Sequence, residues 1–266
     1  MTSANREAQV VRAFIELADR LVDDFDLLDL TIQLTEECAR LLDVAAAGLL
    51  LADAGGRLHL LAATSEQAQH LEVFQLQQRQ GPCVDCYRSG LPISVADLRG
   101  EAERWPDFVA AAEQEGFRSV QAIPMRLRTD VLGALGLFGT RQGTLDERDM
   151  TLAQAFAHVA SIAIVQQHSH ATRAGLLPAL HAAVNSRSEL EIAKGIVAAA
   201  HGVTMQQAFD RLRRHARAET QSLSPLAHHL VNANPSARDA VLVAIARTAA
   251  EPTRPERRGG QDLNPG

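Results

Sequence analysis

Apolar and polar positions follow two different periods in the first third of the chain. Residues 6–43 carry apolar side chains at every third or fourth position, which predicts one or two amphipathic helices. The apolar run 45–52 and the loosely alternating segment 57–64 flank the turn Asp53-Ala-Gly-Gly56, so they are predicted to be two strands joined by a tight turn. A polar helix is predicted to follow over residues 65–78.

Three more strands and another helix are predicted before the middle of the chain. A short strand is predicted over 92–97, a helix over 105–115, and two strands over 117–127 and 131–140 that are joined by the polar turn Arg128-Thr-Asp130. Adjacent strands are joined by short hairpins, and helices are mixed among them. The predicted fold class is therefore α+β, with an antiparallel sheet rather than a parallel doubly wound one.

A long helix is predicted to begin at Leu145 and to connect this front half to the rear of the chain. Its apolar residues hold a heptad spacing for two repeats, at Leu152, Ala155, Val159 and Ile162. Polar residues over 166–173 interrupt this seam, which resumes at Leu176. Two interpretations stay open: the seam pairs two copies of the chain, or this helix packs on its own sheet.

The rear of the chain is predicted to be helical throughout. One helix ends at His201-Gly202, where glycine suits a left-handed cap, and residues 204–207 have the capping-box form that starts the next. Ser224-Pro225 is predicted to start a third helix, and Asn234-Pro235 a last one that ends near Ala250. The tail, residues 251–266, is rich in Pro, Gly and Arg and is predicted to be disordered.

Composition adds a division of charge between the two halves. Hydrophobic residues make up 46% of the 266 residues, which is enough for a core, and the net charge is −6. Residues 168–266 hold 12 basic and 8 acidic residues, net +4, whereas residues 1–167 are net −10. The N-terminus lacks a secretory signal, the apolar runs are too short for a membrane span, and three cysteines predict a reducing cytoplasm.

The basic residues of the rear helices fall on particular sides. Arg187 and Lys194, the only lysine, lie opposite the apolar arc of one helix, and Arg213, Arg214 and Arg217 flank the apolar stripe of the next. They are expected on an outer face of a small bundle. Two interpretations of these basic residues stay open. They form a solvated face with ion pairs such as Arg187–Glu191, or they form a phosphate-binding patch. The linker between the second and third helices is long for a helix-turn-helix motif, which disfavours DNA.

The rear helices resemble an ANTAR domain, a family of RNA-binding modules in bacterial transcription antiterminators. The resemblance covers about residues 173–232. It is carried by Ser186-Arg187, Glu191-Ile-Ala-Lys-Gly195, Ala208-Phe-Asp-Arg-Leu-Arg-Arg-His-Ala-Arg217 and Leu226-Ala227. One departure is Ile192, where the family commonly has Gln. The resemblance implies that RNA is contacted by Arg187, Lys194, Arg213, Arg214 and Arg217, with Ala193 and Gly195 permitting close approach.

The front half resembles a GAF domain of the type fused to ANTAR domains in actinobacteria. The resemblance is carried by Gly81-Pro-Cys-Val-Asp-Cys-Tyr-Arg-Ser-Gly90, Arg104-Trp-Pro106, Gly116-Phe-Arg-Ser119 and Ala122-Ile-Pro-Met125. It implies a GAF-like sensor domain over 10–167, an ANTAR bundle over 168–232, an extra helix over 233–250 and the tail. The GAF fold hosts many ligands, so the likeness leaves the small molecule or protein partner of this domain open.

Together the two resemblances imply an antitermination regulator. The GAF domain would sense a ligand or partner, and the connecting helix would transmit the change, in a homodimer. The ANTAR bundles would then bind stem-loops in nascent RNA and block formation of a terminator. Two bundles in one dimer could engage two hairpins and gain from effective concentration.

Cys83 and Cys86 form the remaining candidate site. A structural zinc site needs four ligands, so this single CxxC pair predicts no metal, and a thiol redox switch is the better functional interpretation beside simple packing. Cys83 follows Pro82 and is expected at a helix start, where the helix dipole lowers the pKa of a thiol.

The chain carries no motif of an enzyme. There is no nucleophile with a positioned base, and Gly133, Gly136 and Gly139 repeat within a strand instead of forming a phosphate loop. Glycine within a strand often marks close approach by another element or a ligand. We therefore expect no catalysis and no cofactor. The alternatives to an RNA-binding regulator are a small-molecule or redox sensor whose helical tail docks a protein, and a DNA-binding regulator.

Overall fold

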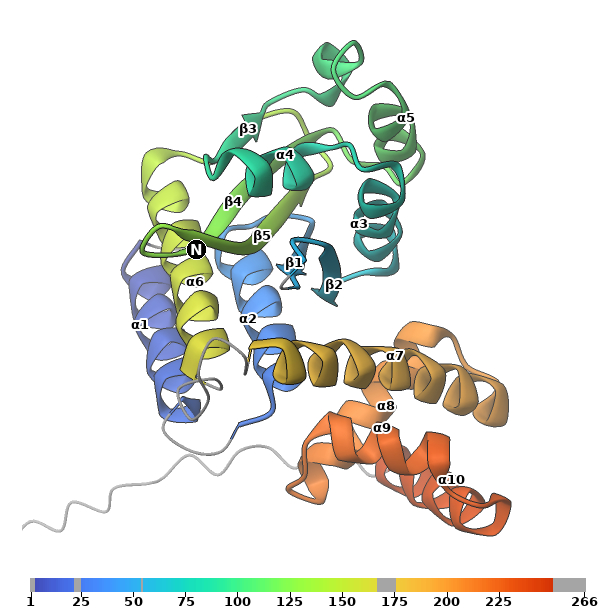
Figure 1. Ribbon diagram of the computed structural model, residues 1–266. Coiled ribbons are helices and arrows are strands. Elements are labelled where there is room, and N and C mark those ends of the chain that lie inside the picture. Colours follow the sequence, from blue (N-terminus) through green and yellow to red (C-terminus); the bar gives the residue numbers. More distant parts are fainter. Residues whose placement is uncertain (1–2, 22–24, 54, 167–175, 251–266) are drawn as a thin grey trace, which may run out of the picture.

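The computed structural model describes residues 3–21, 25–53, 55–166 and 176–250. Its centre is a five-stranded sheet in the order β2-β1-β5-β4-β3 (Figure 1). Every neighbouring pair is antiparallel, which confirms the predicted α+β class. The strands are β1 (Ala46–Ala52), β2 (Leu58–Ala63), β3 (Ile93–Val95), β4 (Ser119–Leu127) and β5 (Asp130–Gly139).

Two layers of helices cover the two faces of this sheet. Side chains alternate between the faces along each strand. In β1, Leu49 and Leu51 point towards one layer, and Ala46 and Leu50 towards the other. The first layer is α1 (Ser3–Arg20), α2 (Leu27–Leu41) and α6 (Glu147–Gln166). The second is α3 (Glu66–Gln78), α4 (Pro82–Ser89) and α5 (Pro106–Gln114), with the short helix η1 (Leu98–Glu101). We call the sheet with these helices the sheet domain.

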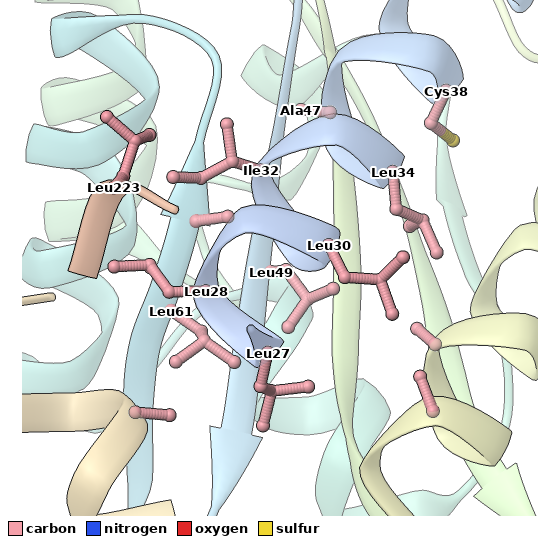
Figure 2. Close-up of a cluster of buried hydrophobic side chains, with 14 of the residues drawn as sticks. Leu27, Leu28, Leu30, Ile32, Leu34, Cys38, Ala47, Leu49, Leu61 and Leu223 are labelled. Carbon is pink, nitrogen blue, oxygen red and sulfur yellow. The ribbon is translucent and has the colours of Figure 1, made fainter. Parts of the chain in front are cut away.

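Helix α2 is central to the first layer. It begins at Asp26, whose carboxylate accepts hydrogen bonds from the backbone N–H groups of Leu28 and Asp29. Figure 2 shows its leucines directed at the sheet and at the neighbouring helix, with Leu34 among them. Leu223, from the rear of the chain, lies on the other side of α2 beside Leu28 and Ile32. Helix α2 therefore packs against both the sheet and the rear helices, and α7 also contacts β2 directly.

Truncation of Leu34 tests this packing. Leu34 is fully buried, so Leu34→Ala is expected to lower the free energy of unfolding by about 2–5 kcal/mol through lost contacts and a residual cavity. The matched control is Leu91→Ala, because Leu91 is 62% exposed and its truncation should change stability by less than about 0.5 kcal/mol. Urea denaturation of the two variants measures the difference, and equal losses would contradict the packing.

Only the start of helix α4 was predicted, at Cys83, and its extent was not, because Gly81-Pro82 is typical of a turn. It begins at Pro82, whose fixed φ suits the first helical position, and ends at Gly90 in the left-handed region at φ 65°. The other predicted strands and helices of the front half are confirmed.

Helix α6 packs on the sheet of its own chain. Its buried residues are Ala153, Phe156, Ala157, Ala160, Ser161, Ala163 and Ile164. The predicted seam residues lie beside this face and are half-buried. Phe156 also stacks on Phe14 of α1, with ring centroids 4.9 Å apart. The predicted joint falls almost entirely outside the described residues, because α6 ends at Gln166 and the next described helix begins at Leu176.

Residues 176–250, the described rear of the chain, form four helices, which we call the rear bundle. They are α7 (Leu176–His201), α8 (Met205–Ala218), α9 (Leu223–Asn232) and α10 (Pro235–Ala250). Gly202 adopts the left-handed conformation, and Thr204 and Gln207 form the predicted capping box. Their shared core contains Leu190, Val197, Leu212, Leu226, Leu230 and Ile245. The predicted tail lies outside the described residues.

Two details of the rear bundle were predicted wrongly. Helix α9 begins at Leu223 with Ser222 as its N-cap residue, two positions before the predicted Ser224. Helical periodicity also predicts that Ile192 shares the apolar arc of α7 with Ala193 and Val197, but its side chain is 52% exposed. Both errors arise because the turn signals and helical periodicity fix a position only to within one or two residues.

Candidate nucleic-acid interface

Three of the predicted RNA-contacting residues lie where the rear bundle meets the sheet domain. Arg187 and Lys194 are two turns apart on α7, and they are only 9% and 8% exposed. Glu191 lies between them and binds both. Its carboxylate forms an ion pair with Arg187 Nη2 at 2.8 Å and accepts hydrogen bonds from Lys194 Nζ at 2.9 and 3.1 Å. The predicted Arg187–Glu191 pair is therefore confirmed.

Arg187 also reaches the sheet domain directly. Its Nη2 atom donates a hydrogen bond of 2.7 Å to Oε1 of Gln69, in the second turn of α3. Burial lowers the pKa of this guanidinium, and the nearby Glu191 carboxylate acts in the opposite direction. Lys194 Nζ lies 5.8 Å from the centre of the Phe209 ring of α8. A cavity of only about 40 Å³ remains between these side chains and the sheet domain.

Arg213 makes a second contact between the two parts of the chain. It forms an ion pair with Glu36 of α2, across 177 positions of sequence. Arg217, one turn further along α8, is exposed. Partial burial, together with the like charges of Arg213 and Arg20, lowers the pKa of Arg217. These arginines converge on a cavity of about 90 Å³ that Asp29 and Leu223 also line.

The third contact joins α2 to the start of α9. The backbone N–H of Leu223 donates a 3.0 Å hydrogen bond to Oδ2 of Asp29. Burial, with the charge of Asp26 adding to it, raises the pKa of Asp29 to about 6. The side chain of Leu223 is buried in the same cluster as Leu28 and Ile32 (Figure 2).

The expectation that the basic residues occupy an outer face is wrong for Arg187 and Lys194. Arg213 is half-buried, while Arg214 and Arg217 are exposed. Arg214 lies apart from the others, since its Nη1 donates to the carbonyl of Ala249 at 2.9 Å. The cause is that α7 and α8 turn this side towards the sheet domain.

The two small residues of the motif have different positions. Ala193 is fully buried in the rear bundle. Gly195 is half-buried, and a Cβ atom added there would have no neighbour within 4 Å. Of these two residues, Gly195 is the one with open space beside it.

Sequence reasoning missed the sheet-domain partners Asp29, Glu36 and Gln69. They come from two helices far from α7 and α8 in sequence, so no local pattern connects them. The only signal was the division of charge between an acidic front and a basic rear.

Comparison with known families decides the identity of both parts. A model of the GAF domain matches residues 26–165, more than half of the chain. The chain belongs to the GAF domain family. A model of the ANTAR domain matches residues 179–231, which lie within α7–α9. GAF domains are sensor domains, and ANTAR domains are RNA-binding antitermination domains. The two domains of this chain are therefore those of a signal-transducing antitermination regulator.

Two solved structures are similar to the GAF domain, and one of them has a TM-score above 0.5. The GAF domain of an Acinetobacter phosphoenolpyruvate-protein phosphotransferase is 15% identical, with a TM-score of 0.51, over 65% of this chain and 99% of that one. The GAF domain of a Coxiella burnetii phosphoenolpyruvate-protein phosphotransferase is 14% identical, with a TM-score of 0.49, over 61% of this chain and 96% of that one. At 15% identity, the similarity to the Acinetobacter domain shows the fold and nothing about function. The comparison with curated proteins gave no match.

The two motif cysteines lie inside the GAF domain. Cys83 is at the start of α4, as predicted, and both Cys83 and Cys86 are fully buried with free thiols. Burial raises the pKa of Cys86 to about 12, and burial, with the Glu72 carboxylate adding to it, raises the pKa of Cys83 well above its ordinary value. The prediction of a lowered thiol pKa is therefore wrong, and the reactive thiolate is disfavoured in this conformation.

A buried polar cluster surrounds Cys83. Gln75 Oε1 accepts a 2.9 Å hydrogen bond from the backbone N–H of Cys83, and Gln75 Nε2 donates to Glu72 Oε2 at 2.9 Å. The thiol lies 3.5 Å from Glu72 Oε1. A Cβ atom on Gly136 would stand 2.5 Å from that oxygen and 2.8 Å from Cys83 Sγ. The close approach predicted from the strand glycines is therefore made by the domain itself, through side chains at Gly136 and through the backbone carbonyl of Leu50 at Gly133.

Two searches of the described residues bear on other functions. No group of three or more His, Cys, Asp or Glu side chains in the described part could hold a metal ion. No helix within the same ranges has the length and hydropathy that crossing a membrane requires.

Proposed function

We propose that this chain is an RNA-binding regulator of transcription antitermination, acting in the cytoplasm. In this proposal the ANTAR domain binds stem-loops in nascent transcripts and blocks formation of a terminator, and the GAF domain controls that binding. The role is regulatory and requires no catalytic step. The observation that carries the proposal is the gathering of Arg187, Lys194, Arg213 and Arg217 on one side of α7 and α8, within the matched ANTAR domain.

The chemistry of these residues suits RNA loops. Arginine presents a planar fork of donors that matches a phosphate and stacks on unpaired bases, and lysine adds a compact charge. Single-stranded loops expose both phosphates and splayed bases to such groups. Because Gly195 has no side chain and has open space beside it, an RNA backbone could approach α7 closely there.

The proposal includes a homodimer with two ANTAR domains. Val11 and Ile15 lie one turn apart on α1, and their side chains are 58% and 55% exposed. Helix α1 stacks on α6 through Phe14 and Phe156, so this apolar surface adjoins the connecting helix. Two bundles in one dimer would engage two hairpins with a raised effective concentration.

Salt dependence is the first test of this function. The probe is a labelled RNA with two stem-loops, recovered by crosslinking the full chain to native transcripts, which we call the two-hairpin RNA. If three to five cations neutralise phosphates, the logarithm of the affinity should fall with the logarithm of salt at a slope of about −2 to −4. This corresponds to a loss of roughly 16- to 250-fold between 50 and 200 mM salt.

Competition separates this function from the alternatives. Unlabelled two-hairpin RNA should displace the probe, whereas duplex DNA of the same length in tenfold excess should displace little of it. Equal displacement by duplex DNA would favour a DNA-binding regulator. Absence of any salt-dependent binding would favour a sensor whose helices dock a protein.

A further inference from the structure

We infer that the GAF domain inhibits RNA binding by covering the cationic side of the ANTAR domain, which we define as Arg187, Lys194, Arg213 and Arg217. Polar groups of the GAF domain then lie where RNA phosphates would bind. This inference rests on the proposed function and states how that function is regulated. Three contacts carry it, and all of them run from α2 or α3 of the GAF domain to α7, α8 or α9 of the rear bundle.

In these three contacts, polar groups of the GAF domain bind the donors of the rear bundle that we propose to bind RNA phosphates. The carboxylate of Glu36 pairs with Arg213, as a phosphate oxygen would. The amide oxygen of Gln69 accepts from Arg187 at 2.7 Å. Asp29 accepts from the first backbone N–H of α9 at 3.0 Å, at a helix N-terminus. Two carboxylates and one amide oxygen of the GAF domain therefore stand in for anionic ligands.

Burial makes the two states mutually exclusive. Arg187 and Lys194 are less than one-tenth exposed, so a phosphate cannot reach them while the GAF domain is in place. Their neighbours across the contact include Ile32 and Ser65 of the GAF domain. RNA therefore binds only after the two domains separate, and the apparent affinity is lowered by the small fraction of open chains.

The interface between the GAF domain and the rear bundle has features of an interface that can open and close. It combines the three polar contacts with the burial of Leu223 in the cluster that contains Leu28 and Ile32, and cavities of about 40 and 90 Å³ remain within it. Asp29 carries a cost of its own, because its Oδ1 atom is buried without a hydrogen-bond partner among the described residues. A signal that loosens α2 or α3 would release the cationic side.

Charge reversal at Glu36 tests the inference. In the full chain, Glu36→Lys places a cation against Arg213 and is expected to tighten binding of the two-hairpin RNA at least tenfold. The matched control is Glu37→Lys, which makes the same change of charge one residue further along α2. Glu37 pairs with Arg40 of its own helix, so this control should change the affinity less than threefold.

A second pair of variants guards against misfolding of the first. Gln69→Arg places a second guanidinium against Arg187, whereas Gln67→Arg adds the same charge at an exposed site on the same helix. Gln69→Arg should tighten RNA binding at least fivefold relative to Gln67→Arg. It should also increase the radius of gyration measured by X-ray scattering, which a merely local change would leave unaltered.

The outcomes separate the inference from the proposed function. If all variants and the wild-type chain bind the RNA with the same salt-dependent affinity, the inference is overturned and the proposed function stands. If no folded variant binds the RNA, the proposed function itself fails. Tighter binding by Glu36→Lys and Gln69→Arg, but not by their controls, supports both.

Discussion

Replacing Arg187, Lys194 and Arg213 by alanine in the open Glu36→Lys chain is expected to weaken binding of the two-hairpin RNA by at least 100-fold. Each charge-assisted hydrogen bond to phosphate contributes on the order of 1.5–3 kcal/mol, and the losses of neighbouring groups are not additive. The slope of log affinity against log salt should become shallower by about two to three. Fluorescence anisotropy at four salt concentrations measures both quantities.

The control for this variant removes the same charge elsewhere. Arg57, Arg88 and Arg148 are exposed arginines of the GAF domain, and their joint replacement by alanine leaves the ANTAR domain untouched. This control should reduce RNA affinity by less than about threefold through net charge alone. Equal weakening by both triple variants would mean that the binding is unspecific attraction to the whole protein.

The second large effect concerns the stability of the GAF domain against pH. Burial raises the pKa of Glu72 from 4.5 to about 8, because the charged carboxylate loses its water inside the domain. The folded chain then holds this proton more tightly than the unfolded chain. The stabilisation is therefore complete below about pH 4.5 and is lost as the pH rises through about 8.

Glu72→Gln should remove this dependence, because glutamine resembles the protonated acid and has no charge to bury. Relative to the wild-type chain, the variant should gain stability progressively from pH 5 to pH 9, by on the order of 4–5 kcal/mol in total. Denaturant unfolding at five pH values measures the difference. Glu66 is exposed in the first turn of the same helix, so the free energy of unfolding of Glu66→Gln should depend on pH as that of the wild type does. A constant difference between Glu72→Gln and wild type across this range would contradict the buried, neutral state of Glu72.

Much of the fold could be predicted because local signals agree with tertiary packing. Period-two alternation and short polar turns marked the hairpins, and the left-handed Gly202 and the Thr204–Gln207 capping box marked helix ends. Local signals were insufficient at α9. Its first N–H is bound by Asp29, nearly two hundred residues earlier, so the helix begins before the proline signal predicts.

The candidate site was predictable in its residues but not in its surroundings. Helical periodicity put Arg187 and Lys194 on one side of α7, because two turns separate them. Periodicity gives the direction of a side chain relative to its own helix and says nothing about which element lies opposite. The burial of these two cations, the contact of Arg187 with Gln69 and the pairing of Arg213 with Glu36 therefore required the structure.

Crosslinking followed by mass spectrometry tests the central claim most directly, in the full chain bound to the two-hairpin RNA. The account predicts RNA-linked peptides from α7 and α8 that contain Arg187, Lys194 and Arg213, together with loss of the Glu36–Arg213 contact in the bound state. Crosslinks confined to the GAF domain would contradict it. So would RNA bound to chains whose Arg187 and Lys194 remain covered.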